Sequence, residues 1–348
     1  MNGRGSLLPR AAAIILPGIF LLWLFLFGSD PNTHQSTWDP RGPVARLQLD
    51  LFWWIFWAAV FVYIVVEIAL VYAIFRFRRR PGDGMPTQTH GNTRLEIAWT
   101  IAPSVILAII AVPTVSALWK VLTLPNEGVR LEVNAVAHQW WWEFNYPSLG
   151  IKTANELHIP QDTVAVIHLE SKDVIHSLWV PKLGGKIDMV PGRKNMLWLQ
   201  GDEPGVFYGH CAEFCGEAHS LMRFRAVVHT QADFDAWVAA QRLPAAAPPA
   251  GQAATGRDIF MGKGACIGCH TVRGTNAQSP IGPDLTHVGS RLTIAAGILD
   301  NNHNNLVKWL ANPEGIKPGN LMATVIGSNI KFTPDELNAL ATYLESLK

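Results

Sequence analysis

The stretch "HCAEFCGEAHSLM" at residues 210–222 places two cysteines, a histidine and a methionine in one short segment. Cys211 and Cys215 are four residues apart, His219 follows four residues later, and Met222 three residues after that. A disulfide would use only the cysteines, and zinc prefers thiolate, imidazole and carboxylate ligands over thioethers. The segment therefore predicts a metal site that needs all four side chains.

Thiolates, imidazoles and thioethers are soft ligands, and soft ligands select copper. One cysteine with two histidines and a weak axial methionine would form a mononuclear blue-copper site. Two cysteines can instead bridge two copper ions, which leaves one imidazole for each metal. A second histidine must then come from another loop, and the best candidate is His176 in "SKDVIHSLWVPKLGGKIDMVPG" at residues 171–192. The other histidines of this region are more typical of structural or surface positions: His138, His158, His168, His210 and His229.

Short alternating runs of apolar and polar residues surround this segment between residues 126 and 242. Examples are "VRLEVNAVA" at 129–137 and "RFRAVVHT" at 223–230, and glycine, proline and aspartate separate such runs. An alternation of period two predicts strands with one buried face. Several short strands at this spacing predict a β-sandwich, which we expect over 126–242.

Two long apolar segments precede the predicted strands. Residues 51–75 would span about 37 Å as a helix, enough to cross a bilayer, and residues 97–119 form a second such segment. The loop between them is rich in arginine, and positively charged loops stay in the cytoplasm. We therefore expect a two-helix transmembrane hairpin over 45–122, with everything after residue 120 outside the cytoplasm.

The first 30 residues contain a further apolar stretch, 11–27, which follows Arg4 and Arg10. This layout is typical of a signal peptide or of an extra N-terminal anchor, which we expect at 1–30. The formal net charge of the chain is +1, and charged residues make up only 16% of it. This balance argues against a nucleic-acid binder and against a protein for acidic substrates.

The two remaining cysteines lie in "CIGCH" at residues 266–270. This is the motif for covalent haem attachment, in which Cys266 and Cys269 form the thioether links and His270 is the proximal axial ligand. Met322 is the only methionine after the motif, so we expect it to be the sixth ligand and to raise the reduction potential. The alternatives for this position are His287 and His303.

The region around the motif predicts an all-α cytochrome c domain. Residues 256–348 are mostly helical by pattern, and "IGPDLTHVG" at 281–289 resembles the Gly-Pro-x-Leu segment of class I cytochromes c. We expect Pro283 to pack against His270. The preceding segment 243–255, "LPAAAPPAGQAAT", is rich in proline and alanine and has no side chains that predict packing, so it predicts a linker.

Three segments together resemble subunit II of cytochrome c oxidase: "CAEFCGEAHSLM", "DVIHSLWVPKLGGKIDMVPGR" and "AHQWWWEFNY". The resemblance covers roughly residues 45–240, and the cysteine segment is its most specific part. It implies a two-helix membrane anchor and a cupredoxin-like β-sandwich that holds the dinuclear copper centre CuA. The implied ligands are Cys211 and Cys215 as bridging thiolates, His176 and His219 as terminal ligands, and Met222 with the backbone carbonyl of Glu213 as weak axial ligands.

The resemblance assigns roles to three more residues. Trp140, the first tryptophan of "QWWWEF" at 139–144, matches a surface tryptophan through which electrons enter the copper site, and strand alternation would place it on the same face as Trp142. The side chain of Glu213 matches one that reaches a magnesium or manganese ion at the contact with subunit I. Glu96 matches a glutamate at the cytoplasmic mouth of a proton path, although a carboxylate there also favours the helix dipole.

The sequence thus predicts a membrane-anchored multidomain subunit of a haem–copper terminal oxidase. Electrons would pass from an external donor, cytochrome c or a similar protein, to haem c, to CuA and then to subunit I. Oxygen reduction to water and proton translocation would occur in that other chain of a prokaryotic plasma membrane. The alternative is a membrane-tethered electron carrier that serves a nitrogen-oxide reductase, whereas a copper chaperone would leave the covalent haem unexplained.

Overall fold

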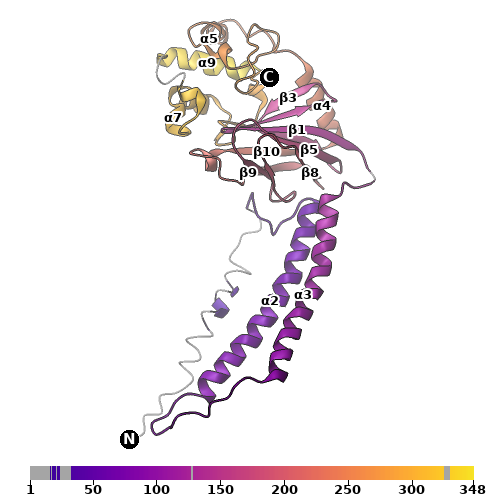
Figure 1. Cartoon of the computed structure of the whole chain (residues 1–348). Coiled ribbons are helices and arrows are strands. Elements are labelled where there is room, and N and C mark those ends of the chain that lie inside the picture. Colours follow the sequence, from indigo (N-terminus) through magenta and orange to yellow (C-terminus); the bar gives the residue numbers. More distant parts are fainter. Residues whose placement is uncertain (1–15, 17, 21, 24–32, 127, 325–329) are drawn as a thin grey trace. The chain divides into compact units, whose positions relative to one another are not determined.

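The computed structural model describes residues 16, 18–20, 22–23, 33–126, 128–324 and 330–348 (Figure 1). The predicted signal peptide or extra anchor at 1–30 lies almost entirely outside these residues. Contacts divide the chain into two compact units, one formed by residues 1–39 and 47–123 and the other by residues 40–46 and 124–348.

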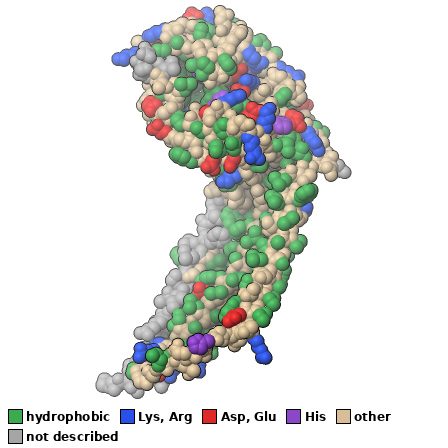
Figure 2. Space-filling model, viewed as in Figure 1, with side chains coloured by type: hydrophobic (Ala, Val, Ile, Leu, Met, Phe, Trp, Pro, Cys, Tyr) green, Lys and Arg blue, Asp and Glu red, His purple; other side chains and the backbone are tan. Residues whose placement is uncertain are grey.

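The first unit contains two long helices, α2 (Pro43–Arg76) and α3 (Thr93–Leu122). Both are long and apolar enough to cross a membrane, and Figure 2 shows hydrophobic side chains along them. The large apolar side chains of these helices are mostly exposed, which suits helices that face lipid rather than a protein core. The predicted spans 51–75 and 97–119 lie inside these two helices.

Helix α3 begins with reciprocal hydrogen bonds between side chain and backbone. Asn92 accepts from the backbone N–H of Leu95 at 3.3 Å, and the Glu96 carboxylate accepts from the backbone N–H of Asn92 at 3.2 Å. Both bonds satisfy donors that a helix start leaves unpaired. Glu96 therefore has a local structural role in the position where the sequence predicts a proton path.

The second unit begins with a β-sandwich, as predicted. One sheet has the strand order β3-β2-β1-β5-β8 and the other β4-β10-β9-β6-β7. Aromatic side chains from alternate positions fill the space between the sheets, with Trp142, Phe144 and Phe224 fully buried. The strands are β1 (Arg130–His138), β2 (Trp141–Tyr146), β3 (Ile151–Ala154), β4 (Glu156–Pro160), β5 (Val164–Ser171), β6 (His176–Trp179), β7 (Ile187–Met189), β8 (Asn195–Leu199), β9 (Gly205–Cys211) and β10 (Arg223–His229).

Strand pairing in the second sheet places the cysteine segment beside His176. Strand β9 ends at Cys211, the chain crosses a short 3-10 helix at His219–Leu221, and β10 returns antiparallel to β9. Strand β6 pairs with the other edge of β9, with Leu178 opposite Cys211. Because His176 begins β6, its side chain reaches the same end of the sheet as the cysteines.

A helical domain completes the second unit. Helices α5 (Gln252–Met261) and α9 (Pro334–Ser346) pack against each other, and Gly256 allows this approach because a Cβ there would lie 2.0 Å from the carbonyl oxygen of Ala339. The domain core includes Phe260 and Tyr343. The other elements of the helical domain are 3-10 turns at Cys266–Gly268 and Val288–Ser290, the hairpin β11 (Thr293–Ile294) and β12 (Leu299–Asp300), α6 (His303–Ala311) and α7 (Pro313–Ile316), whereas α4 (Gln231–Arg242) packs on the β-sandwich.

The expectation that segment 243–255 has nothing to pack against is wrong. Ala245 donates its backbone N–H to the carbonyl of Arg273 at 2.9 Å, and His287 donates to the carbonyl of Leu243 at 3.0 Å. Helix α5 already begins at Gln252. Backbone hydrogen bonds hold this segment to the helical domain. The content of proline and alanine could not predict them, because every residue carries a backbone carbonyl whatever its side chain.

Candidate functional site

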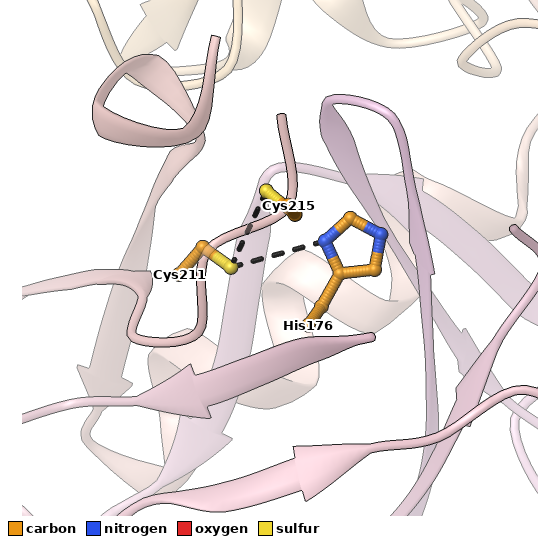
Figure 3. Close-up of side chains that lie close together, drawn as sticks. All are labelled: His176, Cys211 and Cys215. Carbon is orange, nitrogen blue, oxygen red and sulfur yellow. Dashed lines mark hydrogen bonds between the residues drawn. The ribbon is translucent and has the colours of Figure 1, made fainter. Parts of the chain in front are cut away.

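The thiols of Cys211 and Cys215 face each other at the end of the second sheet (Figure 3). Their sulfurs are 3.8 Å apart, both residues are buried, and both thiols are free. A disulfide has its sulfurs about 2.0 Å apart, so the pair is arranged as two separate ligands.

The other four predicted copper ligands surround this pair. His176 Nδ1 lies 3.8 Å from the sulfur of Cys211, and His219 Nδ1 lies 3.5 Å from the sulfur of Cys215, so each cysteine has its own imidazole. The Met222 sulfur lies 3.9 Å from Cys215. The carbonyl oxygen of Glu213 lies 3.2 Å from Cys211. The fold therefore brings all six residues together from two distant segments.

Asp173, which sequence reasoning missed, orients His176. Its Oδ1 lies 2.8 Å from His176 Nε2, and its two oxygens accept backbone N–H groups of Gln139 and Val174 at 2.7 Å each. The bond to Asp173 leaves His176 Nδ1 for the cysteine side, as a carboxylate beside a metal-binding histidine does. Burial is the largest single influence and lowers the pKa of His176, but the interactions with Asp173 and Cys211 together raise that pKa above its usual value. The signal in the sequence was an aspartate three residues before the histidine.

A proton between the two thiols forms a hydrogen bond that joins Cys211 and Cys215. The hydrogen bond with Cys215 lowers the pKa of Cys211 to about 3, although burial acts in the opposite direction. The same hydrogen bond and burial raise the pKa of Cys215. Metal ions bind thiolates, so occupation of the pair by metal would release that proton.

The donor set around these sulfurs suits copper. It consists of two thiols, two imidazoles, one thioether and one backbone carbonyl, all within 3.2–3.9 Å of a cysteine sulfur. Soft sulfur and imidazole ligands favour copper, and hard cations such as magnesium favour oxygen ligands. The same six residues therefore fit a copper site and not a magnesium site.

A second cavity, of about 310 Å³, lies in the helical domain. Cys266, Cys269, His270 and Met322 all line it. His270 Nδ1 donates to the carbonyl of Pro283 at 2.8 Å, which fixes the tautomer and leaves Nε2 for a metal. The expected contact with Pro283 therefore runs through its backbone oxygen. Burial lowers the pKa of His270, so the imidazole stays neutral as a ligand must.

The rest of this cavity fits a porphyrin. Its wall is largely apolar and includes Phe260, Leu306 and Leu340. The two alternative histidines point elsewhere: His287 donates to the carbonyl of Leu243, and His303 contacts Glu345 and Asn338. Neither histidine lines the cavity, whereas Met322 does.

Residues of the β-sandwich also line the helical domain's cavity. Trp140 is one of them, and its Nε1–H donates to the carbonyl of Cys215 at 2.9 Å. The amide of Gln139 donates to the same carbonyl at 2.8 Å. Trp140 lies in the turn before β2, half-buried and packed against the core that contains Trp142, so strand alternation does not set its direction. The side chains of Trp140 and Gln139 thus contact both sites.

The remaining predicted residues lie apart from these contacts. The Glu213 side chain is exposed beside Phe214, whose ring is 76% exposed. Glu96 belongs to the other compact unit, at the start of α3. Among the histidines assigned structural roles, His138 stacks on Trp141, and His158 lies 2.8 Å from His229.

The fold is a cupredoxin-like β-sandwich with a cluster of thiols, imidazoles and a thioether, and a domain with a covalent haem motif follows it. These features define a class of electron-transfer proteins that contain copper and haem. Comparison with known families agrees over most of the chain. Residues 32–117 match the transmembrane domain of cytochrome c oxidase subunit II, residues 148–230 match its periplasmic domain, and residues 253–348 match cytochrome c. The chain belongs to the cytochrome c oxidase subunit 2 family and carries a C-terminal cytochrome c domain.

Relatives match over nearly the whole chain. Cytochrome c oxidase subunit 2 of Alkalihalophilus pseudofirmus is 38% identical over 97% of this chain and 98% of its own length. The subunit of the same name from Bacillus subtilis is 36% identical over 90% of this chain and 92% of its own length. The solved periplasmic domain of subunit II from Bradyrhizobium japonicum is 29% identical, covers 34% of this chain and 97% of that domain, and has a TM-score of 0.33.

Membership of this family establishes the main predictions. The chain is a membrane-anchored subunit of an oxidoreductase complex, its family implies copper and haem c, and its partners are subunit I and a cytochrome c donor. The nitrogen-oxide alternative has no support among the relatives described above.

Proposed function

We propose that the six residues of the cysteine cluster hold a dinuclear CuA centre and that the helical domain holds haem c. Cys211 and Cys215 are the bridging thiolates, and the geometry around them supports one histidine for each copper. The weak axial ligands are Met222 and the carbonyl of Glu213. In the second site Cys266 and Cys269 carry the thioether links, and His270 and Met322 are the axial ligands.

The domain order follows from this assignment. We place the membrane hairpin at 45–122, the copper domain at 126–242, the connecting segment at 243–255 and the haem domain at 256–348. When bound, haem c and the copper pair each accept and release one electron without large rearrangement of their ligands. The protein's contribution is to keep the two sites close and their ligands rigid.

The position of Trp140 is the observation that carries the proposed route. Its ring lines the haem cavity and its N–H bonds the carbonyl of Cys215, a residue that holds copper in this proposal. One aromatic side chain therefore bridges the wall between the two sites. With haem and copper bound, an electron from an external donor would pass from the haem domain by way of Trp140 to the copper pair and on to subunit I, where oxygen is reduced to water.

The exposed side of the cysteine segment is the proposed contact with subunit I. Glu213 and Phe214 point outward there, while the cysteines on either side point inward. A backbone carbonyl beside the Cys211 sulfur and an exposed carboxylate on the same residue would let Glu213 contact copper and also a magnesium or manganese ion at the subunit boundary. Loss of manganese or magnesium from the purified oxidase in Glu213→Gln, with copper retained, tests this role.

The arginine-rich loop supports the orientation in the membrane. Its charges predict that it lies in the cytoplasm, which places both redox domains on the extracytoplasmic side of a prokaryotic plasma membrane. At the end of this loop, Glu96 is the proposed mouth of a proton path into subunit I. Glu96→Gln keeps an acceptor for the Asn92 N–H, so a fall in oxidase turnover without a fall in helix stability would assign the role to the charge.

The route through Trp140 is tested in the purified oxidase by stopped-flow reduction, with haem and copper absorption followed separately. Trp140→Ala should slow copper reduction by roughly tenfold or more, because small displacements in a reacting pair have large effects on rate. Trp140→Phe keeps a ring without the N–H donor and should give an intermediate rate. The matched control is Trp237→Phe, a change in α4 where the ring stacks on His158. Equal rates of copper reduction in the unaltered protein and in all three variants would contradict the proposed route.

A further inference from the structure

Three buried charged side chains lie where the haem domain meets the copper domain. Glu156, Arg225 and Lys317 are only 2%, 7% and 3% exposed. Glu156 and Arg225 belong to β4 and β10 of the copper domain, and Lys317 follows α7 of the haem domain. All three bond backbone groups of the other domain, and all three also bond a residue of 292–297, the segment around β11.

Glu156 binds the start of that segment. One carboxylate oxygen accepts the backbone N–H of Leu292 at 2.6 Å and that of Thr293 at 3.3 Å. The other oxygen lies 3.3 Å from His158, which contacts His229 in turn. Since β4 is the edge strand of its sheet, Glu156 offers its carboxylate where no further strand follows. The haem domain fills this position.

Arg225 binds the end of the same segment. Its guanidinium group lies 3.8 Å from the centre of the Tyr208 ring and donates to the carbonyl of Gly297 at 3.2 Å. The backbone N–H of Arg223 donates to the carbonyl of Ala296 at 3.0 Å. Gly297 has a φ of +78° and a Cβ there would lie 3.0 Å from Arg223, so glycine permits the close approach.

Lys317 binds in the reverse direction, from the haem domain to the copper domain. Its ammonium group donates to the backbone carbonyl of Trp140 at 2.5 Å and reaches the carbonyl of Ala295 at 3.4 Å. Gly319, two residues later, lies against the Trp140 ring, because a Cβ there would be 3.1 Å from the ring edge. Burial lowers the pKa of Lys317 to about 7, with Cys215 acting in the opposite direction.

Stability alone does not account for this arrangement. Buried charges lose hydration, and well-packed apolar residues in their place are often as stable or more stable. Lys317 bonds two carbonyls and no carboxylate. Directional bonds to defined backbone atoms do, however, select one orientation of two packed surfaces, which apolar packing does less strictly.

We propose that Glu156, Arg225 and Lys317 form an interdomain polar contact that holds the haem domain in one orientation on the copper domain, with Lys317 as the positioning residue for Trp140. The proposal rests on the electron route through Trp140 only for its effect on rate. The haem domain then acts from a fixed position instead of moving freely on segment 243–255. Its presence also covers Trp140, so soluble donors reduce the copper pair only through the haem domain.

The test uses the assembled oxidase with Lys317→Met, which keeps a long side chain without the charge. The matched control is Lys308→Met, an exposed lysine on α6 of the same domain. Hydrogen exchange of the amides in 292–297 should become roughly tenfold faster in Lys317→Met and stay unchanged in Lys308→Met, because loss of the contact allows local opening. The α5 and α9 amides report whether the haem domain itself remains folded.

Two kinetic measurements separate positioning from general damage. Reduction of haem by the donor should keep its normal rate in Lys317→Met, while subsequent copper reduction should slow and direct copper reduction by added cytochrome c should appear. The haem and copper absorption spectra should remain those of the unaltered protein. If Lys317→Met does not assemble, Glu156→Leu tests the same contact from the copper domain through the same amides.

Unchanged hydrogen exchange at 292–297 in Lys317→Met and in Glu156→Leu would overturn the interdomain contact, whatever the effect of Trp140→Ala on the rate of copper reduction. Conversely, faster exchange with no rate effect in either Lys317→Met or Trp140→Ala would retain the contact and reject the electron route. Faster exchange with a slow rate in Trp140→Ala alone would remove Lys317 from the positioning of Trp140. Each proposal can therefore fail separately.

Discussion

The copper cluster and the haem cavity are built in opposite ways. The copper donors come from two segments that strand pairing brings together, and each lies within 3.9 Å of a cysteine sulfur. In the haem cavity, Cys266, Cys269 and His270 are nearly contiguous in sequence, and the wall around them is largely apolar. The copper site therefore depends on strand register and hydrogen bonds, while the haem site depends on covalent attachment and hydrophobic closure.

The two sites should therefore fail independently, although the Gln139 and Trp140 side chains join them. A lost donor in the copper cluster leaves its neighbours buried and without their metal. A lost axial ligand in the haem cavity leaves the thioether links in place. Trp140 and Gln139, which line the cavity and donate to the Cys215 carbonyl, should change communication between the sites without emptying either.

The largest expected effect is at the bridging thiolates. Cys215→Ser should abolish the mixed-valence copper signal, in which one unpaired electron is shared by two ions, and should leave the haem spectrum unchanged. Copper analysis and electron paramagnetic resonance of the purified oxidase measure this. The reverse variant, Cys266→Ala with Cys269→Ala, should remove covalent haem and keep both coppers. Loss of both centres in either variant would break the comparison.

Asp173→Asn tests the hydrogen bonds that the copper site requires. The amide cannot provide the negative charge that orients and supports the His176 imidazole, so copper affinity should fall by about 10–100-fold. Competition with a copper chelator gives the affinity. Glu132→Gln, in an exposed pair with His168, is the matched control and should bind copper normally. Equal affinities in the two variants would mean that strand register alone orients His176.

Met322→Ala should have a smaller effect, confined to the haem cavity. The covalent links hold the haem, so we expect full occupancy, a lower reduction potential and loss of the absorption band of iron–thioether ligation. Optical redox titration measures all three. Persistence of the band would assign the sixth position to another ligand, and His287→Gln and His303→Gln would then identify it.

The smallest expected effect is a pH dependence of folding stability that comes from His229, which contacts His158, the histidine next to Glu156. Burial and the neighbouring His158 lower the pKa of His229 to about 4, against 6.5 for an imidazole in the unfolded chain. Between these values the unfolded state binds the proton and the folded state does not. The stability contribution is therefore complete above pH 6.5 and decreases as pH falls toward 4. Thermal unfolding of the full chain should show a shallower pH dependence in His229→Phe, and identical slopes would exclude this group.

Much of the molecule was predictable because its signals are local. The apolar segments, the period-two runs and the contiguous CxxCH motif each specify structure or chemistry within a few residues. The cysteine segment works in the same way, because its four donors within residues 210–222 can reach one another through a single turn of the chain.

Other features depend on strand pairing and on domain packing. No local pattern shows that β6 lies beside β9, that Asp173 receives the Gln139 N–H, or that Lys317 reaches the carbonyl of Trp140. Such contacts join backbone atoms to side chains that are distant in sequence. Because every residue carries the same backbone groups, the sequence does not show which of them a side chain will bind. The residue identities alone set which atoms could bind copper and haem. That a tryptophan lies between them became visible only in the folded molecule, because it requires two separately folded surfaces to meet in a single orientation.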